Sequence, residues 1–203
     1  VYNYALVTII AQTFVGLFSV FLELFKKGKE WIKLSFATLG ALWICYAGNL
    51  HMAYNWLAAY FKGEEFKYFF PDSTRIIDHT INEYPAYSIV LGDVHGHYLA
   101  LPFLVIVLAL AMVALTKKIG TKQKLIFNAM ISPLIIALYG INSWDMITAV
   151  FIFMVIHLYQ VVSLNEEMEK KIKYFLLSGA ALILPGLVLV LPFLRLGTFL
   201  HKD

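Results

Sequence analysis

The stretch LALPFLVIVLALAMVALT, residues Leu99–Thr116, carries no charged side chain over its whole length. Crossing the hydrocarbon core of a bilayer takes about 20 largely apolar residues in a helix, so this stretch predicts a transmembrane span. Similar windows lie on both sides of it, at Tyr2–Phe25, Trp31–Leu50, Leu125–Ile141, Met146–Leu164 and Tyr174–Leu194. None alternates as a strand does, and a bilayer admits only helices or closed barrels. The sequence therefore predicts an all-α, polytopic bundle of about six transmembrane helices.

The composition agrees with a membrane protein. The chain has 203 residues, 61% of them hydrophobic and 14% charged, whereas a soluble domain is about 25% charged. Its one cysteine, Cys45, excludes an intrachain disulfide and a cysteine-rich zinc site. The net charge of +3 is small and scattered, which argues against nucleic acid as a partner. Because the chain starts at Val1 and stops at Asp203, we expect one transmembrane domain over residues 1–203, completed by the remaining helices of a longer chain.

Basic residues gather in alternate connections between the predicted spans. Eleven of the sixteen Lys and Arg lie in or directly beside the first, third and fifth connections, at Lys26, Lys27, Lys29, Lys33, Lys117, Lys118, Lys122, Lys124, Lys170, Lys171 and Lys173. Basic loops stay in the cytoplasm, so the second and fourth connections are expected on the outer face. The sequence predicts a protein of the cell membrane whose longest loop, residues 55–98, is extracytoplasmic.

This loop is where we expect the functional site. A connection between two helices needs only a few residues, and ionisable groups gathered beside a bilayer are usually functional. The first part of the loop, Asn55–Phe69, mixes aromatic and charged residues. Such a mixture is typical of a helix that lies in the membrane interface, in contact with membrane lipid.

The pentapeptide DVHGH, residues 93–97, is the most informative motif of the loop. In an extended segment alternate side chains share a face, so Asp93, His95 and His97 are expected to converge. One carboxylate and two imidazoles form a ligand set for a divalent cation such as Mn²⁺ or Mg²⁺. We expect Leu99 to begin the next helix, whose N-terminus favours an anion such as phosphate. The alternative is that the histidines bond lipid headgroups or each other.

Three polar residues upstream complete the candidate site in this loop. Glu83 is a candidate general base, because a carboxylate beside an apolar interface holds a proton more readily. Arg75 suits a bidentate grip on phosphate or carboxylate, and Asn82 is a candidate to bind substrate. The alternatives are a helix cap or an ion pair with Arg75 for Glu83, and pairing of Arg75 with Asp72 or Asp78.

Polar residues elsewhere allow two interpretations. Asn142 and Asp145 follow the fourth span on the predicted outer side, so they either help to bind substrate or form a helix-terminating turn. His157 and Gln160 lie inside the fifth span, where we expect interhelical hydrogen bonds. In the last span, kinks and close helix contacts are expected from Pro185, Pro192, Gly179 and Gly186.

The segment FPDSTRIIDHTINEYPAYSIVLGDVHGHYLALPF, residues 70–103, is followed by GINSWD at residues 140–145. Together they resemble the YYY-type membrane proteins of archaea and Chloroflexi-like bacteria. That family is a domain of unknown function grouped with the GT-C glycosyltransferases. The resemblance covers the middle of the chain, and it implies a polytopic helical enzyme that takes a sugar from a polyprenyl-phosphate donor. It also implies acidic residues on an outward-facing loop.

The leading interpretation is a glycosyltransferase-like membrane protein that acts on the outer face. Glu83 or Asp93 would take the proton from an acceptor hydroxyl. A cation held by Asp93, His95 and His97 would stabilise the departing phosphate, and Arg75 would bind the lipid phosphate. One alternative is a metal-dependent hydrolase of lipid-linked phosphates. Another is a non-enzymatic transporter or scaffold module, although a transporter usually has ionisable groups near the middle of the bilayer.

Overall fold

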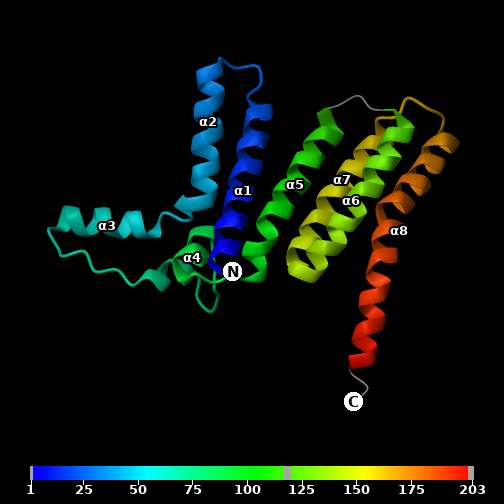
Figure 1. The fold of residues 1–203 in the computed structure, drawn as a ribbon. Coiled ribbons are helices and arrows are strands. Elements are labelled where there is room, and N and C mark those ends of the chain that lie inside the picture. The colour runs from blue at the N-terminus through cyan, green and yellow to red at the C-terminus, as the bar shows by residue number, and fades with distance from the viewer. Residues whose placement is uncertain (1, 117–119, 201–203) are drawn as a thin grey trace. The chain divides into compact units, whose positions relative to one another are not determined.

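The computed structural model describes residues 2–116 and 120–200, and within these ranges every regular element is a helix (Figure 1). The elements follow one another as α1 (Tyr2–Leu24), α2 (Glu30–Leu42), the π-helix η1 (Trp43–Ala47), α3 (His51–Lys62), the 3₁₀-helix η2 (Phe70–Thr74), α4 (Pro85–Leu91), α5 (Gly96–Thr116), α6 (Thr121–Ile141), α7 (Ser143–Val162) and α8 (Met168–Leu200). The predicted all-α fold is confirmed.

Five helices of the described chain are long and apolar enough to cross a membrane, namely α1, α5, α6, α7 and α8. A sixth span arises if the bent pair of Glu30–Ala47 and His51–Lys62 is counted as one, and the bend between its two parts is 83°. Five of the predicted spans thus correspond to single helices, and the second, Trp31–Leu50, corresponds to α2 followed by η1, the first part of the bent pair. The predicted interfacial helix Asn55–Phe69 is shifted, because α3 starts at His51 and ends at Lys62.

The residue that stops α3 is Gly63, which takes the left-handed conformation with φ +67°. The Glu64 N–H reaches back to the Ala59 carbonyl at 3.0 Å, as in the glycine-terminated helix ends that close many helices. The chain after it has no regular structure until Phe70. We call the bend between η1 and α3, residues 48–50, the elbow.

The chain divides into two compact units, Val1–Leu99 and Ala100–Asp203, and the boundary falls inside α5. In the first unit, α1 packs against α2. A side chain at Gly40 would meet the ring of Phe21 at 2.7 Å, so the glycine is what allows this close approach. The fully buried Tyr98 joins the unit through its hydroxyl, which donates to the Leu6 carbonyl at 2.9 Å.

The second unit is centred on α6, which packs against α7 and α8. Pro185 lies inside the continuous helix α8, and Ser132 of α6 takes part in the hydrogen bonds beside it. The Ser132 hydroxyl accepts from the Gly186 N–H at 2.7 Å and donates to the Ile183 carbonyl at 3.2 Å. A Cβ at Gly186 would lie 2.6 Å from Ile136 Cγ1, so the predicted close helix contact is present there. Neighbouring side chains resupply the backbone bonds that a proline removes, which is how spanning helices tolerate it.

Candidate functional site

Two contacts fix the polar loop to the elbow within the first unit, and a third joins two parts of the loop itself. The Asn49 amide donates to the Ser73 carbonyl at 2.6 Å, and the Ser73 hydroxyl lies 2.8 Å from the Tyr84 hydroxyl. Gly48 has φ +60°, and a side chain there would collide with the Tyr84 ring. The residue directly before Tyr84 is Glu83, so these contacts hold the candidate base beside the end of η1.

A second polar contact ties the start of α3 to the same loop. His51 Nδ1 lies 2.7 Å from the Tyr68 hydroxyl. Burial raises the pKa of the Tyr68 phenol, and the nearby negative charge of Asp72 adds to this, while a hydrogen bond to Ser73 opposes it. The phenol therefore stays protonated at neutral pH and is available as a hydrogen-bond donor. This arrangement gives His51 a structural partner.

The end of α4 and the first turn of α5 position the residues of the DVHGH motif. Helix α4 runs from Pro85 to Leu91 and is followed by Gly92, which has φ +67°, and the Asp93 N–H donates to the Ser88 carbonyl at 3.0 Å. Helix α5 begins at Gly96, three residues earlier than the predicted Leu99. The motif is therefore not extended as predicted, because His97 already lies in the first turn of α5. It converges through a helix start instead of through strand alternation.

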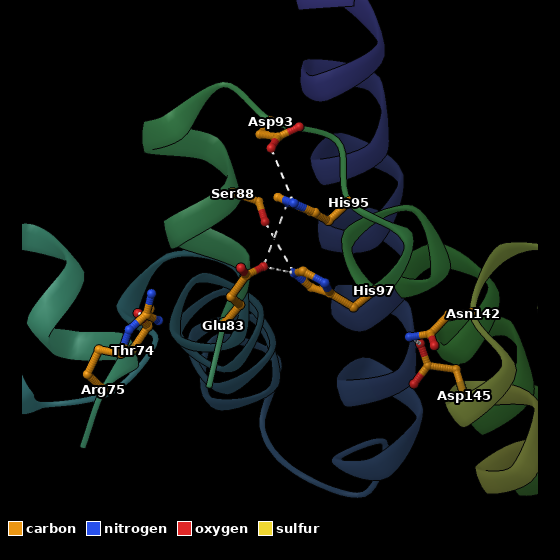
Figure 2. Close-up of polar contacts among 9 residues, drawn as sticks. All are labelled: Thr74, Arg75, Glu83, Ser88, Asp93, His95, His97, Asn142 and Asp145. Atoms are coloured by element: carbon orange, nitrogen blue, oxygen red, sulfur yellow. Dashed lines mark hydrogen bonds and ion pairs between the residues drawn. The ribbon is translucent and has the colours of Figure 1, made fainter. Parts of the chain in front are cut away.

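The structure brings four of the predicted site residues together, as Figure 2 shows. The Oε2 atom of Glu83 lies 3.0 Å from His97 Nε2 and 3.7 Å from His95 Nδ1. The other ring nitrogen of His95, Nε2, lies 3.3 Å from Asp93 Oδ2. The two imidazole rings stack with their centroids 5.5 Å apart. We call Glu83, Asp93, His95 and His97 the His–carboxylate cluster.

Glu83 has an unusual environment for a carboxylate. Its side chain as a whole is 21% exposed, but the Oε2 atom is buried and has no hydrogen bond from any described residue. The nearby His97 nitrogen is close enough for an ion pair, yet it is not aligned to donate a hydrogen bond to that oxygen. A buried acceptor without a donor costs about 1–3 kcal/mol. The Oε2 atom is thus free to accept a hydrogen bond from a bound hydroxyl.

Ser88 joins the cluster, and the sequence analysis did not single it out. Its hydroxyl lies 3.3 Å from His97 Nε2, and the residue is completely buried. A serine nucleophile needs a histidine that contacts the serine through one ring nitrogen and the carboxylate through the other. Here Ser88 and Glu83 share the same nitrogen of His97, so the geometry of a Ser–His–Glu relay is absent. The role that fits Ser88 is to position the imidazole of His97.

The donor atoms of the cluster suit a divalent cation by type, because carboxylates and imidazoles bind such ions. Their arrangement does not suit one as it stands. No three His, Cys, Asp or Glu side chains of the described ranges are placed to hold a metal ion. Asp93 and His95 instead face each other at 3.3 Å.

Arg75 and Asn82 flank the loop between η2 and the cluster. Arg75 is exposed, and its guanidinium donates to the Thr74 hydroxyl at 3.1 Å. The predicted alternative pairing with Asp72 or Asp78 does not occur within the described chain. Figure 2 draws Arg75 apart from the His–carboxylate cluster. Asn82 is engaged in the loop itself.

The engagement of Asn82 is local. Its N–H bonds the Thr74 carbonyl at 2.8 Å, and its amide donates to the Thr80 hydroxyl at 2.7 Å. In the turn between Thr74 and Asn82, His79 has a positive φ of 61°, which is uncommon for a residue with a side chain. Asn82 therefore helps to close the turn that leads to Glu83, and a contact with substrate stays a prediction.

Asn142 and Asp145 belong to the second unit and form the cap of α7. The Asn142 side-chain oxygen Oδ1 accepts from the Trp144 N–H at 3.3 Å, and the side-chain amide nitrogen donates to Asp145 Oδ2 at 2.7 Å. Asparagine is among the preferred residues at this position of a helix. The predicted helix-terminating turn is therefore present, and a role of these two residues in substrate binding stays a prediction.

The described chain has five to six apolar helices of spanning length, and one of its loops holds an ionisable cluster. These features define a polytopic integral membrane protein. A family model described as "Uncharacterized membrane protein (DUF2298)" matches residues 1–199. The chain therefore belongs to the DUF2298 family of membrane proteins. No curated protein and no solved structure matches it.

Proposed function

We propose that this protein is a glycosyltransferase-like membrane enzyme that transfers a sugar from a polyprenyl-phosphate donor, with Glu83 as its general base. One observation carries the proposal. The buried Oε2 atom of Glu83, flanked by His95 and His97, has no hydrogen-bond donor among the described residues. A base must lie within hydrogen-bond reach of the proton it removes. An acceptor hydroxyl bound at this oxygen supplies the missing donor and is held by the group that deprotonates it.

In the proposed step, the acceptor hydroxyl donates a hydrogen bond to Glu83 Oε2. Its oxygen attacks the anomeric carbon of the sugar while its proton passes to the carboxylate. The bond between that carbon and the phosphate oxygen breaks, and the electron pair leaves with the polyprenyl phosphate. Asp93 is the other candidate base, and through its 3.3 Å contact it orients His95 beside Glu83.

The phosphate group is assigned to Arg75. This side chain is exposed, its guanidinium contacts the neutral hydroxyl of Thr74, and no carboxylate of the described residues pairs with it. A guanidinium binds phosphate through two parallel hydrogen bonds. Asn82, Asn142 and Asp145 are the further candidates for contacts with the substrate. The proposed location of the loop is the outer face, on the strength of the basic connections on the opposite side.

A divalent cation, Mn²⁺ or Mg²⁺, held by Asp93, His95 and His97 stays a prediction. The donor types favour it, whereas the pairing of Asp93 with His95 does not. No step of the proposed reaction is therefore assigned to a cation.

The test uses the full-length protein in membranes supplied with polyprenyl-phosphate sugars. Glu83→Gln is expected to reduce transfer by about 10²-fold or more, which is the usual contribution of a general base. The matched control is Glu65→Gln, because Glu65 is an exposed carboxylate of the same loop that pairs with Lys67 at 3.0 Å. The control should keep the wild-type rate. Equal rates for the two variants would overturn the proposal, and release of free sugar or phosphate without a new glycoside would favour the hydrolase alternative.

A further inference from the structure

The second unit contains a groove between α6, α7 and α8 that is separate from the His–carboxylate cluster. Its volume is about 650 Å³, which falls within the ~300–1,000 Å³ of small-molecule sites. The wall is almost wholly apolar, and it includes Ile135, Met154, Phe175, Ile183 and Leu187. At its rim Leu176 is 62% exposed, on the surface of a helix that is long and apolar enough to span a membrane. The groove is therefore accessible from the hydrocarbon region.

Two polar residues contribute to this wall, and only one has an unused bonding atom. The hydroxyl of Ser132 already donates to one backbone group and accepts from another. His157 is only 7% exposed, and its Nε2 atom is buried without a hydrogen-bond partner among the described residues. Both His157 and Gly179 line the groove, and Nε2 is the atom nearest to where a Gly179 side chain would start, at 3.9 Å. The glycine therefore places no side chain of its own beside Nε2.

The hydrogen bonds around His157 fix which ring nitrogen carries the proton. Ser178 has one hydroxyl hydrogen, and it donates this hydrogen to the Tyr174 carbonyl at 2.7 Å. The 3.1 Å contact between Ser178 and His157 Nδ1 must then use Nδ1–H as the donor. An imidazole buried among hydrocarbon is neutral, because a charge there is costly. The proton therefore sits on Nδ1, and Nε2 is a bare acceptor.

We propose that this groove binds a long-chain lipid alcohol, whose hydroxyl donates a hydrogen bond to His157 Nε2 while its chain lies along α7 and α8. A bare acceptor needs a donor, which a hydroxyl supplies and a ketone, an ether or a plain hydrocarbon chain does not. The wall offers no charged side chain, so a phosphate or carboxylate head group has no partner in it. The occupant thus carries one neutral donor and a long apolar body.

Equilibrium binding to the full-length protein in lipid nanodiscs tests this proposal. The probes are radiolabelled hexadecan-1-ol and its methyl ether, which differ in the donor hydrogen and one methyl group. The wild type is expected to bind the alcohol about tenfold more tightly than the ether, the size of one net hydrogen bond. His157→Phe keeps a planar aromatic ring without an acceptor nitrogen, leaves the bond from Ser178 to Tyr174 possible, and should bring the two affinities within about twofold.

Two glycine variants form a matched pair. Gly179→Ala places a methyl group at ordinary contact distance from Nε2, so it should block the alcohol without disturbing the helix. Gly140→Ala adds the same methyl group to α6 where nothing lies within 4 Å, and it should keep the wild-type preference. Equal behaviour of these two variants would contradict the proposal.

Ser178→Ala addresses the position of the proton directly. Without the serine acceptor, the imidazole is free to carry its proton on Nε2 and to donate to a ligand. A ketone probe, heptadecan-2-one, should then gain affinity relative to the alcohol. The proposal is overturned if the wild type binds alcohol and ether equally, or if it binds neither.

Discussion

At the scale of single residues, the centre of the His–carboxylate cluster is one oxygen atom. Glu83 Oε2 is approached by nitrogens of His95 and His97, yet no described residue donates a hydrogen bond to it. Structural carboxylates are normally satisfied, because an unpaired buried acceptor costs stability. Sites that bind ligands keep such atoms, since the ligand completes them. This oxygen therefore distinguishes Glu83 from the exposed carboxylates of the same loop.

Removing the negative charge of Glu83 should not harm the fold. We expect Glu83→Gln to leave the free energy of unfolding unchanged or to raise it by about 1 kcal/mol, because the buried oxygen loses its charge but no hydrogen bond. Thermal unfolding of the purified variant in detergent measures this. A loss of more than about 2 kcal/mol would mean that the carboxylate is structural, because removing one partner of a buried ion pair strongly destabilises a protein.

Metal binding is a separate prediction at the same scale. A structure determined with manganese is expected to show anomalous density within about 2.0–2.3 Å of at least two of Asp93, His95 and His97, as for small divalent ions. This requires Asp93 and His95 to turn away from each other, because they now meet at 3.3 Å. If that pairing persists in saturating manganese, the cluster is not a metal site.

At the scale of elements, the elbow after η1 determines where the polar loop sits. Gly48 combines φ +60° with ψ −126°, which is open to glycine, and it lies directly against the Tyr84 ring. The residue after the elbow glycine, Asn49, holds η2 through Ser73. A change at Gly48 therefore affects the support of Glu83 and not only the bend itself.

Gly48→Ala is expected to destabilise the protein by about 2–4 kcal/mol, because backbone strain and a clash with Tyr84 add together. The matched control is Gly63→Ala. Gly63 also has a positive φ, but nothing lies within 4 Å of its missing side chain, so its cost should be about 1 kcal/mol. Chemical denaturation in detergent compares the two. Similar costs would show that contact with Tyr84 is unimportant.

The elements could be predicted from the sequence because apolar runs of spanning length leave few alternatives. The observed helix ends differ from the predicted ones where polar residues extend a helix. An example is α5, which begins at Gly96, before the apolar run. Hydropathy does not register these turns, nor the left-handed Gly63 that ends α3. The convergence of Asp93, His95 and His97 was predicted, but through the wrong backbone geometry.

The partners inside the cluster were harder to predict. Ser88 is one polar residue in the short apolar helix α4, and only the packing of that helix beside the start of α5 brings it to His97. The same holds for Glu83, whose contact with two histidines spans more than ten residues of sequence. Contacts of this kind depend on tertiary structure, and the spacing of residues along the chain does not predict them.

At the scale of the whole molecule, the prediction to test is the topology in the membrane. In a background with the buried Cys45 replaced by alanine, cysteines at Thr80 and Ser143 should react with an impermeant thiol reagent added outside intact cells. A cysteine at Gly120 should react only after the membrane is opened. The reason is the basic character of the connection that contains Gly120. The reverse labelling pattern would put the cluster in the cytoplasm and remove the outer-face proposal.

The elbow has a consequence for the lipid environment. The helix that leads to it, α2 with η1, comprises 13 and 5 residues, or about 27 Å at 1.5 Å per residue. That is slightly shorter than a typical hydrocarbon core of about 30 Å. Hydrophobic mismatch should therefore draw the elbow, and with it Glu83, toward the acyl chains as a bilayer thickens. In vesicles of increasing acyl-chain length, hydrogen–deuterium exchange at residues 83–97 should slow steadily, so membrane thickness would govern how much water reaches the carboxylates.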